Sequence, residues 1–289
     1  MSATIEAKPG FVLTIACPDR MGIVADVSRF LFDHGCNIVD SSQYGDSGNG
    51  RFFLRIHFTS EAGAGIETLR REFGPIIEKF AMDATLYDAA RKTRTLILVS
   101  RFGHCLVDLL YRQRIGALPI EVPLIVSNHR DFEDVAAANG IPFRYMPMTE
   151  DNKSAQEAAL LKIVENEKID LVVLARYMQV LSSEMCRRMP GRIINIHHSF
   201  LPGFKGARPY HRAHERGVKL IGATAHYVTA DLDEGPIIEQ EVERVTHALS
   251  ADEFVAAGRD IESRVLARAV KWHAEHRILI NGKRTVVFT

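Results

Sequence analysis

The sequence has few cysteines and no excess of charge of either sign. Its four cysteines, Cys17, Cys36, Cys105 and Cys186, form no C-x-x-C pair and have no spacing typical of a zinc site. A chain of 289 residues with so few cysteines is not expected to depend on disulfides. Lys plus Arg and Asp plus Glu both number 36, so no basic excess indicates nucleic-acid binding and no acidic tail is present.

Long hydrophobic runs are also missing. No stretch of about 18 apolar residues is present, so we expect no transmembrane helix. The first ten residues include Glu6, Lys8 and Pro9 and lack the apolar centre of a signal peptide. Hydrophobic residues make up 46% of the chain and charged residues 25%, which is ordinary for a globular protein. We therefore expect a cytoplasmic protein of one or two domains.

The N-terminal part, residues 1–87, changes between strand-like and helix-like patterns. Apolar side chains alternate over Arg51 to Phe58, which indicates a strand, whereas Ile23, Val27, Phe30 and Leu31 recur at helical spacing. The pattern predicts the order βαββαβ of a ferredoxin-like domain. The expected strands are 11–16, 37–44, 51–58 and 83–87, and the expected helices are 23–34 and 66–80.

A polar, basic stretch over residues 88–94 is expected to be a linker to a second domain, 95–289. Near-continuous apolar strands then alternate with helices, which predicts a mostly parallel open sheet with helices on both faces. A final helix over 252–276 precedes a hairpin turn at Asn281-Gly282. The expected strands are 95–100, 123–127, 171–175, 192–196 and 221–228, and the helices 104–114, 131–138, 154–167, 182–188 and 207–216.

Three polar side chains stand out in this second domain. Asn195 and His197 lie at the carboxyl end of an expected strand, where open α/β sheets bind their ligands. Asp233 follows in a loop that Gly235 and Pro236 bend tightly. An amide can donate to a developing oxyanion, an imidazole can carry a proton, and a carboxylate can orient a water and the imidazole. Asn195 and His197 alone would more often be structural, but Asp233 makes a catalytic site the better hypothesis.

These residues carry a family resemblance. The run from Asn195 to Gly206, N-I-H-x-S-x-L-P-x-F-x-G, and the run D-x-G-P-I-I from Asp233 resemble the folate-dependent formyltransferases, which include glycinamide ribonucleotide transformylase. Residues 1–87, with Asp19-Arg20-x-Gly22-Ile23, resemble an ACT domain. An ACT domain ahead of this catalytic domain is the arrangement of the formyltetrahydrofolate deformylases. The resemblance covers almost the whole chain.

The resemblance implies that Asn195, His197 and Asp233 are catalytic. The implied reaction hydrolyses 10-formyltetrahydrofolate to formate and tetrahydrofolate, which supplies formate to purine synthesis and balances the one-carbon pool. The alternative is transfer of the formyl group to an amine such as glycinamide ribonucleotide. A methionyl-tRNA acceptor is disfavoured by the neutral charge. A third hypothesis, an amino-acid sensor on a decayed catalytic fold, is disfavoured because all three side chains are present.

Departures from the transferase pattern favour water as the acceptor. The loop 100–105 has one glycine among bulky residues, where a transferase has a Gly-rich loop that cradles a phosphate. His198 stands where transferases usually have proline, and Gln179 stands where they have an arginine for the folate tail. The folate-binding residues implied by the resemblance are Tyr177, Met178, Val180, Leu181, Gly206 and Leu232.

Other ligands are expected only at the N-terminal domain. The ACT resemblance implies a homo-oligomer, and an amino-acid effector at Asp19, Gly22 and Asn37 is an open alternative to a purely structural domain. No cofactor and no metal are expected, because no histidine pair has the H-E-x-x-H pattern. The histidines near the expected site are His198, His211, His214 and His226.

Overall fold

The computed structural model of the chain describes residues 9–201 and 209–289, which form two compact units. The first unit extends to Lys92 and includes residues 275–279 and 286–289, and the second comprises 93–274 and 280–285. Among the described residues, no helix is both long enough and apolar enough to cross a membrane. The mixed α/β class predicted from the sequence is confirmed.

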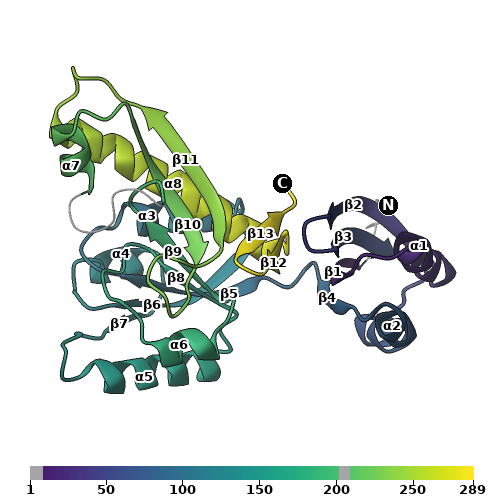
Figure 1. The fold of residues 1–289 in the computed structure, drawn as a ribbon. Coiled ribbons are helices and arrows are strands. Elements are labelled where there is room, and N and C mark those ends of the chain that lie inside the picture. The colour runs from purple at the N-terminus through teal and green to yellow at the C-terminus, as the bar shows by residue number, and fades with distance from the viewer. Residues whose placement is uncertain (1–8, 202–208) are drawn as a thin grey trace, which may run out of the picture. The chain divides into compact units, whose positions relative to one another are not determined.

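The first unit is an antiparallel sheet of four strands in the order β2-β3-β1-β4, with two helices (Figure 1). The predicted βαββαβ order is confirmed. The sheet and helices enclose a core that includes Ile15, Val27, Leu54 and Leu69, all at most 1% exposed. The elements are β1 (Gly10–Pro18), α1 (Ile23–Asp33), β2 (Cys36–Asp46), β3 (Arg51–Ser60), α2 (Ile66–Phe80) and β4 (Asp83–Asp88).

The second unit is a sheet of seven strands in the order β11-β10-β9-β8-β5-β6-β7. The strand pairs from β9 to β7 are parallel, and the pairs β9–β10 and β10–β11 are antiparallel. The strands are β5 (Thr93–Val99), β6 (Ile120–Ser127), β7 (Phe143–Tyr145), β8 (Leu171–Leu174), β9 (Ile193–His197), β10 (Leu220–Tyr227) and β11 (Ile237–Arg244).

Helices cover both faces of this sheet, as predicted. Leu96 and Leu98 of β5 pack into one core with α5 and α6, and α8 lies on the opposite face (Figure 1). Residues 96–99 are all fully buried, because the central strand contacts helices on both sides. The helices are α3 (His104–Arg114), α4 (Glu133–Ala138), α5 (Lys153–Asn166), α6 (Ser183–Arg188), α7 (Pro209–Glu215) and α8 (Ala251–Ala274).

Two strands of the second sheet were not predicted. β7 has three residues at one edge, too few for a periodic signal. β11 forms the other edge and is rich in glutamate, which disfavours a strand in a sequence pattern. Its glutamates face arginines of α8, since Glu241 binds Arg264 at 2.5 Å and Glu239 binds Arg268 at 3.0 Å. Charge pairing replaces the hydrophobic alternation that would have revealed this strand.

The C-terminal hairpin also differs from the expectation of one catalytic domain over 95–289. Its strands are β12 (Ile278–Asn281) and β13 (Arg284–Val287). Leu279 and Phe288 belong to an apolar cluster with Ala16 and Phe53 of the first unit, so the ends of the hairpin are counted with that unit. The domain boundary itself falls between Lys92 and Thr93, within the expected linker.

Candidate active site

Strand β9 places Asn195 and His197 on one face of the sheet. Residues two apart in a strand point to the same side, and Ile193 on that side packs into the core that α5 and α6 cover. Asn195 and His197 continue this face at the carboxyl end of the strand. Ile194 and Ile196, which alternate with them, are buried, so the apolar alternation of β9 holds the two polar side chains in position.

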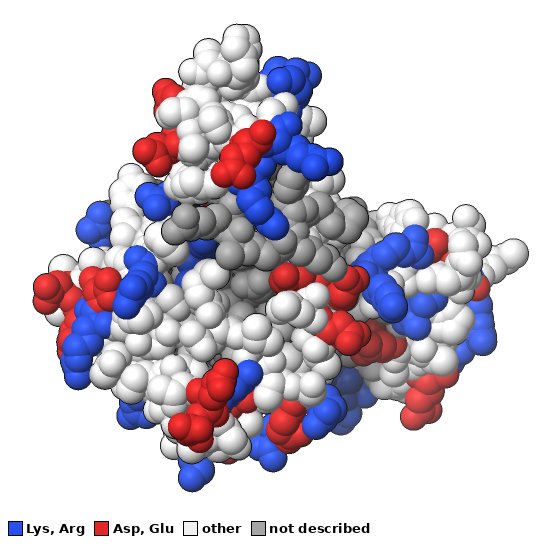
Figure 2. All heavy atoms as spheres, turned by 60° about the vertical axis from the view of Figure 1, so that its left-hand side comes forward, with Lys and Arg blue, Asp and Glu red and all other residues white. Residues whose placement is uncertain are grey.

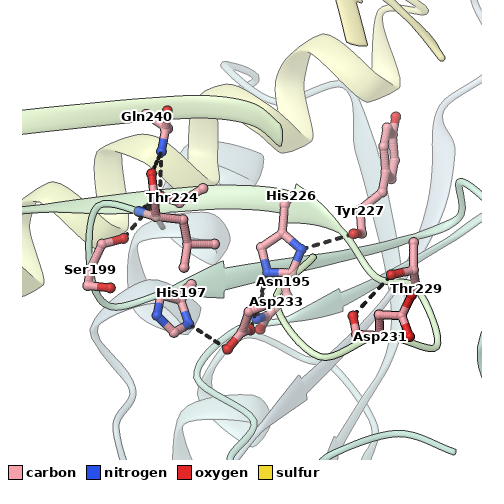
Figure 3. Close-up of polar contacts among 11 residues, drawn as sticks. Asn195, His197, Ser199, Thr224, His226, Tyr227, Thr229, Asp231, Asp233 and Gln240 are labelled. Atoms are coloured by element: carbon pink, nitrogen blue, oxygen red, sulfur yellow. Dashed lines mark hydrogen bonds and ion pairs between the residues drawn. The ribbon is translucent and has the colours of Figure 1, made fainter. Parts of the chain in front are cut away.

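The loop that follows His197 is held by Thr224 and Gln240. Thr224 lies directly opposite His197 in the antiparallel pairing and is fully buried. Its hydroxyl donates to the carbonyl of Ser199 at 3.0 Å and accepts from the backbone N–H of Leu201 at 3.1 Å. The Gln240 amide donates to the same hydroxyl and to the Leu201 carbonyl (Figure 3). These bonds fix the backbone immediately beyond the imidazole.

Asp233 reaches the site from the loop between β10 and β11. The loop is closed at its base by a hydrogen bond from the Tyr227 N–H to the Pro236 carbonyl, 2.9 Å long. Asp233 has a left-handed backbone with φ 57°, which aspartate tolerates better than most residues. A Cβ on Gly235 would lie 1.7 Å from the Tyr227 carbonyl oxygen, so only glycine fits there.

The three predicted catalytic side chains meet around His226 (Figure 3). His197 Nδ1 lies 3.3 Å from Asp233 Oδ2, and the Asn195 Nδ2 atom lies 3.2 Å from His226 Nε2. His226 Nε2 is 3.6 Å from Asp233 Oδ1. An amide donor, an imidazole and a carboxylate therefore face one space, although they come from strand β9 and a distant loop, and His226 of β10 lies among them.

The charge of the site is set by Asp233. The His197 imidazole, whose Nδ1 lies 3.3 Å from the carboxylate, holds the pKa of the Asp233 carboxyl well below its ordinary value, although partial burial acts the other way. The carboxylate is therefore ionised at neutral pH. His197 Nε2 is buried and has no hydrogen-bond partner among the residues the structure describes. With Nδ1 directed at Asp233, this second nitrogen is left to meet a substrate or a water.

A cavity of about 300 Å³ opens at these side chains and is lined by residues of the segment 176–181 and the loop 228–233. Met178, Val180 and Leu232 are more than half exposed, which is unusual for large apolar side chains and gives the cavity an apolar wall. The lining includes Asn195, His197, Asp233, Tyr177, Met178, Val180, Leu181 and Leu232. The remaining predicted binding residue, Gly206, lies outside the described residues.

Tyr177 lines the cavity but is otherwise part of the core. It is 4% exposed and packs with Leu174 and Leu181, and its hydroxyl has no partner among the described residues. Burial, together with the charge of Glu157, raises the pKa of the Tyr177 phenol to about 12. Tyr177 is therefore neutral at physiological pH and offers a wall and a hydroxyl rather than a charge.

The sequence pattern indicated His226 only as one of the histidines near the expected site, with no metal expected there, and did not predict it as part of the catalytic group. It lies at the centre of the group, 2% exposed, because the antiparallel register puts it directly opposite Asn195. The sequence does show that His226 lies two residues after Thr224, so both side chains are expected on one face of the strand. It does not show that β10 pairs antiparallel with β9, because a mostly parallel sheet was expected.

The three predicted effector residues lie exposed in the first unit. Gly22 precedes α1 with φ 95°, and the backbone N–H of Asp19 donates to the Gly50 carbonyl. Asn37 lies on β2, opposite Thr59 of β3. These positions form parts of a turn, a helix start and a strand, so an effector site at them stays a prediction.

One buried group has donors of the kind that bind metals. The ligand atoms of His104, Cys105 and Glu262 lie within 4.8 Å of one another. However, Glu262 already accepts from His104 at 2.8 Å and from the Tyr210 hydroxyl at 2.8 Å, and the Arg176 guanidinium lies 3.3 Å away. The carboxylate is therefore neutralised by protein groups, and the cluster ties α8 to α3 and to the segment after β8.

Comparison with known proteins gives the same division of the chain. Residues 93–270 match the Formyl transferase family and residues 11–74 match the ACT domain family. A formyltetrahydrofolate deformylase from Corynebacterium sp. (strain P-1) is 50% identical over 277 residues, which cover 96% of this chain and 97% of that protein. One from Bacillus subtilis (strain 168) is 49% identical over 281 residues, covering 96% and 93%.

Solved structures agree with the sequence comparisons. The crystal structure of a formyltetrahydrofolate deformylase from Burkholderia mallei superposes with a TM-score of 0.93 at 52% identity and covers 97% of this chain and 100% of that one. A glycinamide ribonucleotide transformylase from Symbiobacterium toebii reaches a TM-score of 0.65 at 33% identity and covers 68% of this chain and 95% of that one. Thus the chain belongs to the formyltetrahydrofolate deformylase family, with an ACT domain ahead of a formyl transferase domain.

Proposed function

We propose that the chain hydrolyses 10-formyltetrahydrofolate to formate and tetrahydrofolate. The observation that carries this proposal is the convergence of Asn195, His197 and Asp233 on one cavity with an apolar wall. The full-length likeness to formyltetrahydrofolate deformylases supports the choice of substrate. The pterin is expected against Met178, Val180 and Leu181, with the formyl group directed at the three polar side chains. No cofactor takes part in this scheme.

In this proposal each of the three residues has its own role in the reaction. Water adds to the formyl carbon, the carbonyl electrons move to oxygen, and the N–H of Asn195 stabilises that oxyanion. Because the pKa of Asp233 is held low, its carboxylate stays ionised and orients both the water and the Nδ1–H of His197. His197 Nε2 takes a proton from the water and delivers it to the folate nitrogen as the carbon–nitrogen bond breaks.

The loop after β5 supports water, rather than an amine, as the acceptor. A Cβ on Gly103 would lie 2.2 Å from the Phe132 ring, so this glycine serves close packing. The Phe102 ring contacts the guanidinium groups of Arg176 and Arg259, whose carbons lie 5.6 and 5.5 Å from the ring centre. A loop packed through such bulky side chains differs from the glycine-rich loops that expose a ring of backbone N–H groups to a phosphate.

A large polyanionic acceptor is disfavoured by the surface charge. On the face drawn in Figure 2, Lys and Arg side chains lie among Asp and Glu side chains rather than in a separate basic patch. A tRNA-binding surface would be expected to gather positive charge. The partners at the catalytic cavity are instead small molecules, a folate and water. At the ACT domain, an amino-acid effector and a second copy of the chain are further candidates.

The test is to incubate the purified protein with 10-formyltetrahydrofolate without any amine and to measure formate and tetrahydrofolate. We expect both products in equal amounts from the wild type. Asp233→Asn should lose about 10³-fold or more in kcat, because the carboxylate orients both water and imidazole. Asp134→Asn, the same exchange at an exposed position of α4 outside the cavity lining, is the matched control and should retain activity.

Two outcomes would contradict the proposal. Turnover that appears only after glycinamide ribonucleotide is added would assign the chain to formyl transfer. An Asp233→Asn variant with wild-type activity would remove the carboxylate from the mechanism.

A further inference from the structure

His226 is a buried histidine that the reaction scheme leaves without a role. It lies on β10, 2% exposed, and faces Asn195 across the β9–β10 pairing. Its ring is held at both nitrogens. Nδ1 lies 2.9 Å from the Tyr227 carbonyl oxygen, and Nε2 lies 3.2 Å from Asn195 Nδ2 (Figure 3).

The first contact fixes the tautomer of the neutral ring. A carbonyl oxygen only accepts hydrogen bonds, so the proton of the neutral imidazole must be on Nδ1. Nε2 then has a lone pair and only accepts. The nearest donor is the Asn195 amide, because the Asp233 oxygen 3.6 Å away is itself an acceptor. Whichever end of the Asn195 amide faces His226 must therefore be its nitrogen.

This requirement decides what Asn195 offers to the substrate. An amide nitrogen has two hydrogens, and one of them is used at His226 Nε2. The amide plane is thereby fixed, and the second N–H remains available in the cavity that Asn195 and His226 both line. Without an acceptor at this point, the amide could rotate by a half turn and present its oxygen, which would repel the oxyanion.

We propose that His226 is a positioning residue that holds the Asn195 amide with its N–H directed at the formyl oxygen. The inference rests on the proposed hydrolysis for its effect on rate, but the orientation itself is a property of the free protein. His226 touches no reacting atom in this scheme. It acts through Asn195 as a hydrogen-bond acceptor, and the Tyr227 carbonyl keeps it in that form.

The kinetic test is a double-mutant cycle with a conservative rescue. His226→Leu removes the acceptor and should lower kcat by about 10- to 100-fold with little change in KM, since a misplaced donor loses much of its effect. His226→Gln can turn its amide oxygen toward Asn195 and should recover most of that loss. In an Asn195→Ala background, His226→Leu should cause no further loss, because the group it positions is gone.

The matched control is Thr224→Val, on the same face of β10 and similarly buried, which removes the hydroxyl that holds the loop after His197 but does not face Asn195. Its effect should be the same in both backgrounds. If His226→Leu lowered kcat by the same factor with and without Asn195, or if His226→Gln were as impaired as His226→Leu, the positioning role would be wrong.

A second measurement does not depend on turnover. The ¹⁵N chemical shifts of the histidine rings report which nitrogen carries the proton, and the His226 signals are identified as those lost in His226→Gln. We expect the proton of the His226 ring on Nδ1 and a lone pair on Nε2. A proton on Nε2 would overturn the inference even if hydrolysis were established, whereas absence of hydrolysis with the expected tautomer would remove only the proposed reaction.

Discussion

At the scale of single residues, Asp233 shows how backbone and electrostatics combine. Its left-handed backbone, φ 57°, aims the carboxylate at two imidazoles, and the imidazole of His197 holds the pKa of the carboxyl low. The motif in the sequence predicted the residue and its loop. It did not reveal the second imidazole, because the contact between Asp233 and His226 depends on the pairing of two strands far apart in the sequence.

The lowered pKa of Asp233 predicts how its contribution to stability depends on pH. In the unfolded chain the Asp233 carboxyl binds its proton at about pH 3.9, whereas in the folded chain it does so only at lower pH. Stability therefore rises with pH through this window. The loss of unfolding free energy caused by Asp233→Asn should be complete above about pH 4 and should shrink as the pH falls further.

Urea unfolding of wild type and Asp233→Asn at about pH 6 and about pH 3.5 measures this difference. A gap between wild type and Asp233→Asn that stayed constant or widened on acidification would mean that the carboxylate is not stabilised in the folded state.

At the scale of elements, the sequence predicted the helices and the apolar strands well, because each carries its own periodicity. The helix expected at 104–114 is α3 itself, and 66–80 is α2. The strands that were missed, β7 and β11, depend on their neighbours: one is an edge of three residues, and the other pairs its glutamates with α8. Local sequence patterns indicate which side chains are buried. They do not indicate a three-residue strand at a sheet edge, or a strand held by ion pairs with a helix.

The loop between β10 and β11 is the element on which the site most depends. Gly235→Ala would place a Cβ at 1.7 Å from the Tyr227 carbonyl oxygen, a backbone atom that cannot move without opening the strand end. We expect kcat to fall by at least about 10²-fold, because displacing Asp233 by about 1 Å has an effect of that size. The β-sheet itself should stay folded.

Activity and far-ultraviolet circular dichroism of Gly235→Ala test this prediction together. Gly74→Ala, the same exchange at a position of α2 where a Cβ would meet no atom within 4 Å, is the control and should retain the activity. Full activity in Gly235→Ala would show that the loop tolerates a shift and that the position of Asp233 is not critical.

At the scale of the whole molecule, the chain returns at its end to the unit with which it began. The sequence predicted the hairpin from Asn281-Gly282, but nothing in its pattern indicated which unit the strands would join. Leu279 and Phe288 are counted with the first unit because they pack with Ala16 and Phe53. The partner surface lies more than 200 residues away in the sequence, so only the tertiary structure reveals it.

This arrangement predicts that the two units respond differently to one substitution. Phe288 is 9% exposed in its cluster, so Phe288→Ala should destabilise the first unit by about 3–5 kcal/mol. The single tryptophan, Trp272, lies on α8 and belongs to the second unit. The substitution should therefore lower the urea midpoint seen by circular dichroism more than the midpoint seen by tryptophan fluorescence.

Val286→Ala, beside Phe288 but only partly buried, should have a smaller effect in the same direction. Equal shifts of both midpoints would mean that the units unfold as one, because a two-state transition gives the same midpoint with every probe.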